Sequence, residues 1–223
     1  MNPSFVTALI DQLALASLSL PDPRPRAKVV DLGLALLCAP KPKTLTSALE
    51  WLDQDQQQWS EDYRLYSQTQ WDGPGFFAPI FRQAVGLYDS TAPRVFVGQD
   101  DTLIRKTGKT IPGVAYARDP LSPPFQVNLV RGQRFVQTSV LVQPRGSEHP
   151  WRAIPVQFTH APVPRIPRQA TPEEVATVKE SRKKRRLSLV ALTQLRFCRR
   201  ELDQTPHGAI QVIEDWSEPV SSL

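Results

Sequence analysis

Two adjacent carboxylates, Asp100 and Asp101, follow a short run of β-branched and aromatic residues in this chain. The next segment is basic, contains a glycine and carries Arg105, Lys106 and Lys109. Carboxylate oxygens suit Mg²⁺, a hard cation, and Lys or Arg side chains beside them can contact phosphate. We therefore expect metal-assisted phosphoryl chemistry here, provided that other parts of the chain supply further carboxylates.

Positive charge is concentrated after this acidic pair. Residues 94–160 hold 9 basic and 4 acidic side chains and residues 161–200 hold 11 and 3, whereas residues 1–93 and 201–223 are net acidic. Basic residues gathered in one part of a chain indicate a polyanionic partner, for which nucleic acid is the default. A solvated helix face explains such a charge run equally well.

Composition indicates a globular protein without a membrane segment. The chain has 223 residues, of which 40% are hydrophobic, and its longest apolar stretch, residues 32–40, is too short to cross a bilayer. Residues 1–20 lack the basic start of a signal peptide, so we expect a cytoplasmic protein. Cys38 and Cys198 are far apart, which favours two core thiols over a disulfide or a zinc site.

The first 93 residues are expected to form a subdomain of four or five helices, for which contact with DNA is a candidate role. Apolar residues at spacings of three and four predict a helix near residues 9–20, and a further helix is predicted over residues 74–87. Residues 27–38 are apolar almost all round, which predicts a helix that is buried on every side.

At Pro93 the pattern changes to that of strands. Val95 to Val97 predict a strand that delivers Asp100 and Asp101 at its far end, and residues 132–143 and 151–159 predict two further antiparallel strands. Thr171-Pro172 followed by two acids is typical of a helix start. After this long helix, residues 209–215 predict a fourth strand.

The expected order is therefore β-β-β-α-β. A fourth strand reached through a helix should lie parallel beside the first, which would bring Asp101 and Asp215 close together. We predict a mixed fold, α+β or α/β, in which the helical subdomain at residues 1–93 precedes a sheet domain at residues 94–223.

Several motifs occur in a characteristic order along the chain. They are Tyr63-Arg-Leu-Tyr66-Ser67 with Trp71, Gln99-Asp-Asp-Thr102, Lys106-Thr-Gly108-Lys109 and Arg131-Gly-Gln-Arg-Phe-Val136. Together they resemble the DDE transposases of bacterial insertion sequences, over most of residues 25–215. The resemblance implies that residues 94–223 form the N-terminal part of a ribonuclease-H-like catalytic domain, incomplete at its C-terminus.

In such enzymes three carboxylates hold two divalent metals, Mg²⁺ or Mn²⁺. One metal activates water or a 3′ hydroxyl, and the other stabilises the leaving oxygen at a DNA phosphate. The family's first acid precedes a Thr, which implies Asp101, with Asp100 as the fallback; the second acid lies on the fourth strand, which implies Asp215. The side chains expected to contact DNA are Lys106, Lys109, Arg105 and Arg134.

The chain departs from the family pattern after Asp215. The family tends to continue with Gly-Ser-Tyr and to place a Glu on a later helix, whereas here Trp216-Ser217-Glu218 follows, and Glu218 is interpreted as a solvated tail residue. We therefore expect a truncated transposase that is inactive alone. The alternative is a non-catalytic DNA-binding protein that forms a homodimer or pairs with an intact transposase.

Overall fold

A computed structural model gives the fold of the chain in two compact units, residues 1–80 and 81–223, and each is described by itself. The residues that it describes are 3–40, 44–53, 59–68, 71–89, 91–108, 111–119, 122–123, 125–126, 128–143, 150–162, 164, 166, 169–184 and 186–213.

The first unit is helical. Its helices are α1 (Pro3–Ser17), α2 (Arg26–Cys38), α3 (Leu45–Trp51), α4 (Ser60–Gln68) and the beginning of α5 (Gly73–Val85), which continues into the second unit. Its core is built from Leu20, Val29, Leu32, Ala35, Ala48, Leu49 and Leu65. These positions come from several helices, so the apolar spacing in the sequence produces one shared core, as expected for amphipathic helices.

The burial of α2 corrects one prediction. Val29, Leu32 and Ala35 are buried, but Leu37 is 58% exposed and Cys38 is exposed, so α2 is not buried on every side. A helix on the surface of a small unit has only one neighbour-facing side, and an apolar residue on the other side stays in contact with solvent. Cys38 is therefore not a core thiol, whereas Cys198 is buried, as predicted.

The second unit is built on a sheet of five described strands. They are β1 (Arg94–Arg105), β2 (Ala115–Arg118), β3 (Leu129–Val142), β4 (Arg152–His160) and β5 (Ala209–Ile213). The order is β2-β3-β1-β5, and β4 also pairs with β3. The long strand β3 pairs with β2 through its first residues and with β4 from Phe135 onward, so both short strands lie on the side of β3 away from β1.

The predicted parallel pairing of the first and last strands is confirmed. β5 lies parallel to β1, with Arg94 opposite Ala209 and Gly98 opposite Ile213, while β1 and β3 are antiparallel. β1 therefore lies between β3 and β5. Within the described residues this two-sided pairing covers Phe96 to Gly98, and Asp100 and Asp101 are paired with β3.

Three details of the predicted sheet domain are wrong. β1 continues to Arg105, so Asp100 and Asp101 lie within the strand rather than at its end, because β3 supplies pairing partners as far as Gly132. β2 was not predicted, since four residues are too few to show a strand pattern. The expected long helix is two helices, α6 (Pro172–Lys184) and α7 (Leu187–Leu202).

The predicted start of α6 has a specific cap. The Thr171 hydroxyl accepts a hydrogen bond from the Glu174 backbone N–H, and the Thr171 N–H donates to the Glu174 carboxylate at 2.8 Å. This reciprocal pair is a capping box, which satisfies two backbone donors at the helix end.

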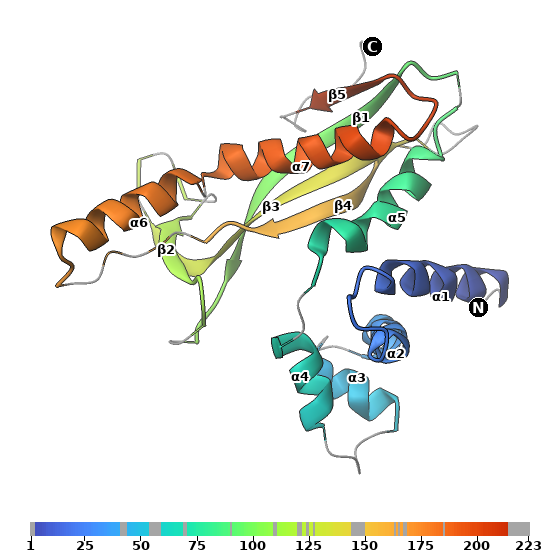
Figure 1. Cartoon of the computed structure of the whole chain (residues 1–223), viewed down its shortest axis with the longest axis horizontal. Coiled ribbons are helices and arrows are strands. Elements are labelled where there is room, and N and C mark those ends of the chain that lie inside the picture. Colours follow the sequence, from blue (N-terminus) through green and yellow to red (C-terminus); the bar gives the residue numbers. More distant parts are fainter. Residues whose placement is uncertain are drawn as a thin grey trace. The chain divides into compact units, whose positions relative to one another are not determined.

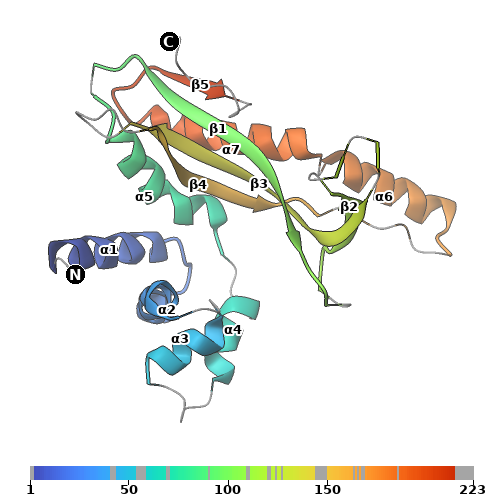
Figure 2. The same ribbon diagram turned by 180° about the vertical axis from the view of Figure 1, so that it is seen from behind.

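Helix α7 covers one face of the sheet. Figure 1 shows α7 lying along β1, β3 and β4, and Figure 2 shows these strands from the other side, in front of the helix. Its buried residues are Gln194, Phe197, Cys198, Glu201 and Leu202. Phe197 packs edge-to-face against Phe81, and Glu201 accepts a bond from Arg82 Nε at 3.0 Å, which pairs its buried charge. Within the described ranges, no helix combines the length and apolar character that crossing a bilayer requires.

Candidate active site on the central strand

Asp100 and Asp101 point to opposite faces of the sheet, because side chains alternate along a strand. Gln99 lies on the same face as Asp101, and its side-chain amide donates to the Ala191 carbonyl in α7 at 3.0 Å. Asp101 is therefore on the face that carries α7, and Asp100 is on the other. Asp100 and Asp101 therefore cannot replace each other in a site. A site on the face that carries α7 would use Asp101, and a site on the other face would use Asp100.

The carboxylate of Asp101 is held by Arg134. The Nε of Arg134 donates to Oδ2 of Asp101 at 2.5 Å, and Nη2 forms an ion pair with the same oxygen. Asp101 lies opposite Val136 in the ladder, so Arg134, two residues earlier on β3, reaches it diagonally. The two side chains are 43% and 40% exposed, which leaves both within reach of a ligand from solvent.

A buried polar network holds this part of β1 against α7. Gln194 of α7 accepts from the Thr138 hydroxyl at 2.7 Å and donates to the Val136 carbonyl and to the Thr159 hydroxyl, each at 2.9 Å. Gln99 also donates to Thr138, at 2.9 Å. The network joins α7 to β1, β3 and β4. Its member on β1 is Gln99, which lies two residues before Asp101. Because Thr138 and Gln194 are buried, their polar groups are costly to leave without partners.

The basic residues predicted to contact DNA lie in different surroundings. Arg134 is paired with Asp101, and Arg105 donates to Asp119 at 2.7 Å while its own side chain remains 66% exposed. Lys106 directly follows β1, and its backbone N–H bonds the Arg131 carbonyl. Lys109 lies outside the described residues. Arg105 and Arg134 thus already have carboxylate partners, which a phosphate would have to replace.

The second predicted acid, Asp215, lies outside the described residues, as do Glu214 and Glu218. β5 is described as far as Ile213, which pairs with Gly98. Among the described residues, no three Asp, Glu, His or Cys side chains are grouped so that they could hold a metal ion. Asp101 faces an arginine instead, so the described residues by themselves do not fit a divalent-metal site.

Sequence reasoning missed two groups of residues around Asp101. Gln194 lies on the buried face of α7, three and four residues before the apolar Phe197 and Cys198, and a polar residue at that spacing is the signal by which it could have been found. Arg182 and Arg186 are among the basic residues of 161–200, for which a solvated helix face is one interpretation, yet both line a pocket together with Arg134. That clustering depends on the break between α6 and α7, which the sequence pattern does not show.

Comparison with known proteins gives one match. The family model described as DDE superfamily endonuclease matches residues 19–207, most of the chain, including Asp100, Asp101 and Arg134. Searches of curated proteins and of solved structures gave no match. Endonucleases of this family act on DNA and generally use a divalent metal. On the evidence of this match, and in agreement with the motif resemblance, the chain belongs to the DDE superfamily endonuclease family.

Proposed function

We propose that this chain carries part of a transposase-type site for DNA strand cleavage and transfer, with Asp101 as its first carboxylate and Asp215 as its second. The observation that carries the proposal is the parallel pairing of β1 with β5. The strand that bears Asp101 is hydrogen-bonded to the strand that leads to Asp215. This pairing, together with the antiparallel strands β3 and β4, is the arrangement of a ribonuclease-H-like sheet, the fold that we propose for residues 94–223.

Asp101 is favoured over Asp100 by its surroundings. Asp101 lies on the face where Arg134 projects from β3, and the Gln99 network fixes the strand beside it. A carboxylate on a well-braced strand, beside a cation that can also meet a phosphate, suits a site in which charge develops at phosphate oxygens. We further propose that Arg105, at the end of β1, and Lys106 and Lys109, which follow it, contact the DNA backbone.

A complete site of this class needs a carboxylate beyond these two. We propose that the third comes from outside these 223 residues, because Glu218 is only three residues after Asp215 and next to Pro219. The 223-residue chain should then neither cleave nor join DNA with Mg²⁺ or Mn²⁺. Robust metal-dependent strand transfer that disappears in Asp101→Asn would show instead that the chain holds a complete site.

Binding of Mn²⁺ tests the role of Asp101 without requiring activity. Mn²⁺ bound to protein loses the sharp electron paramagnetic resonance signal of the free ion, so titration of the purified chain measures its affinity. We expect Asp101→Asn to weaken Mn²⁺ binding and Asp100→Asn, the matched control on the opposite face, to change it little. Equal effects of the two variants would contradict the assignment of Asp101.

The second candidate is a protein that binds DNA without catalysis. The ion pair between Arg134 and Asp101 favours it, because the guanidinium neutralises the carboxylate that a metal would use. This candidate predicts that Mn²⁺ does not bind at all in the millimolar range, while DNA binding persists in a metal chelator. Such a protein would influence transposition by forming a homodimer or by pairing with an intact transposase.

A further inference from the structure

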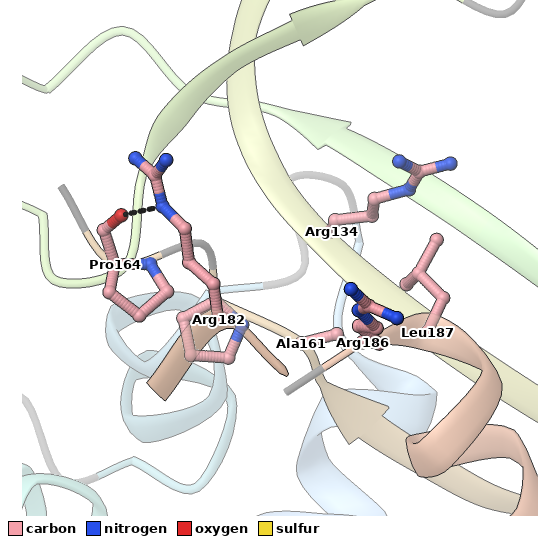
Figure 3. A pocket seen from close by; sticks show the side chains of 7 residues that line it. Arg134, Ala161, Pro164, Arg182, Arg186 and Leu187 are labelled. Carbon is pink, nitrogen blue, oxygen red and sulfur yellow. Dashed lines mark hydrogen bonds between the residues drawn. The ribbon is translucent and has the colours of Figure 1, made fainter. Parts of the chain in front are cut away.

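Residues from β3, from the segment after β4 and from the junction of α6 and α7 line a pocket of about 260 Å³. Three of its described lining residues are arginines: Arg134 from β3, Arg182 from α6 and Arg186 directly before α7. The others are alanine, proline and leucine residues, and no described lining residue is acidic. Figure 3 shows Arg186 near Leu187 and Arg182 beside Pro164.

The positive charge of this pocket is only partly neutralised by the described residues. Arg134 is paired with Asp101, but Nε of Arg182 donates to the carbonyl of Pro164 at 2.9 Å, which is an uncharged acceptor. Arg186 forms no ion pair with any described carboxylate. Like charges held near one another repel, and an anion between them removes that repulsion. The pocket therefore favours an anionic ligand.

The start of α7 adds to this preference. Leu187, the first residue of α7, lines the pocket, and its N-cap residue, Arg186, makes no side-chain capping bond. The first N–H groups of a helix have no acceptor within the helix, and the helix dipole makes this end positive. Anions bind well at such ends. The arginines and the start of α7, which lacks a side-chain cap, are thus two independent features, and both favour the binding of an anion.

We propose that this pocket holds a backbone phosphate of DNA beside Asp101. Its volume of about 260 Å³ lies just below the roughly 300 Å³ at which pockets for drug-sized ligands begin. It therefore has room for a phosphate group with some water. Guanidinium groups recognise phosphate oxygens through paired N–H donors. Arg134 and Arg182 already use some of these donors on Asp101 and on the Pro164 carbonyl, so Arg186 is the pocket arginine without an ion-pair or side-chain hydrogen-bond partner among the described residues.

Arg134 makes the position of this phosphate informative. The side chain of Arg134 contacts Asp101 and also lines the pocket. A phosphate bound in the pocket and the carboxylate of Asp101 would therefore share Arg134 as a neighbour. The inference rests on the proposed function for its choice of DNA as the source of the phosphate. It adds a specific anchoring point, formed by Arg182 and Arg186, which the sequence pattern had grouped with ordinary surface charge.

The test compares two double variants of the full 223-residue chain that lose the same charge. Arg182→Gln with Arg186→Gln alters the pocket, whereas Lys179→Gln with Arg196→Gln alters exposed residues of α6 and α7 that do not line it. Binding of a short fluorescent DNA duplex is measured by anisotropy in EDTA. We expect about tenfold weaker binding for the pocket variant and a salt slope reduced by about one, with less than about threefold weakening for the control. Equal losses, or no loss, would overturn the proposal.

Two further arms keep the outcome unambiguous. Arg186→Gln alone breaks no ion pair between described residues, and it should weaken binding in the same direction while the melting temperature stays unchanged. Inorganic phosphate should displace the duplex only at concentrations at which sulfate does so equally well. Displacement by phosphate far below that level would identify the free anion as the ligand and overturn the assignment to DNA. Because no metal is present, these results are independent of the Mn²⁺ titration.

Discussion

Arg134 donates from Nε to Oδ2 of Asp101 at 2.5 Å, so the carboxylate proposed to bind a metal already has a cationic partner. The pair is about two-fifths exposed on each side, and ion pairs with this exposure contribute about 0–1 kcal/mol to stability. Such a pair is easily exchanged. A metal or a phosphate can therefore replace either partner at little cost to the fold.

Removing this arginine should strengthen metal binding. In Arg134→Gln the carboxylate of Asp101 loses its competitor, so we expect a several-fold higher affinity for Mn²⁺, with a loss of less than about 1 kcal/mol in unfolding free energy. Electron paramagnetic resonance titration measures the affinity, and urea unfolding the stability. Arg152→Gln, an exposed arginine on β4, is the control. Weaker Mn²⁺ binding in Arg134→Gln would show that Arg134 does not compete with the ion.

Replacement of Gln194 should destabilise the second unit. Gln194→Leu leaves the Val136 carbonyl and the Thr159 hydroxyl without their donor, and we expect a loss of about 1–3 kcal/mol in unfolding free energy. Gln83→Leu, at an exposed position of α5, should change stability by less than about 0.5 kcal/mol. Chemical denaturation compares the two. A Gln194→Leu protein as stable as the control would mean that the network does not hold α7.

The protein should lose stability at high pH because the hydroxyl of Tyr88 is partly buried. This hydroxyl donates to the Leu141 carbonyl and accepts from the Phe96 N–H, and burial raises its pKa from 10 to about 12. A raised pKa means that the fold favours the protonated hydroxyl. Its stabilising contribution is therefore complete below pH 10 and is lost as the pH rises through 12.

The matched variant for this prediction is Tyr88→Phe. It should be less stable than the wild type at pH 8, and the difference between the two proteins should shrink as the pH rises from 10 to 12. Melting temperatures of both proteins over this range test it. A difference that stays constant with pH would show that Tyr88 ionises equally easily in the folded and unfolded chains.

The two cysteines should differ strongly in reactivity. Cys38 is exposed, whereas Cys198 is fully buried and burial raises the pKa of its thiol to about 12. Because the thiolate is the reactive form, iodoacetamide should modify Cys38 in the folded protein and Cys198 only after unfolding. Mass spectrometry of the native and denatured protein measures this. Rapid native alkylation of a Cys38→Ser variant would contradict the buried position of Cys198.

Local patterns in the sequence were sufficient to predict most elements of the fold. The helix start at Thr171 depends on neighbouring residues, and α6 begins there as expected. The strand predicted over residues 151–159 is present as β4, although burial does not alternate along it, since Val156 and Gln157 are both buried. The parallel pairing of β1 with β5 followed from a general rule of chain connection. The continuation of β1 to Arg105 could not be predicted in this way, because the length of β1 depends on a partner strand, β3, that is distant in sequence.

The candidate site was predictable only in part, for a similar reason. Asp101 is a candidate from the sequence because it stands in a motif, and its role stays a prediction. Its ion pair with Arg134 depends on the register between β1 and β3, and the arginine pocket depends on where α6 ends and α7 begins. Such contacts join residues far apart in the chain, so their geometry cannot be derived from local spacing.

The pairing of β1 with β5 also bears on how the protein is made. During synthesis β1 leaves the ribosome long before β5, and until then the edge of β1 that β5 will occupy has no strand beside it. An unpaired edge attracts other strands and promotes aggregation, and parallel pairings between distant segments form slowly. Chaperones that shield nascent chains should therefore raise the yield of this protein, and the interval before residues 209–213 emerge is the period in which it needs them most.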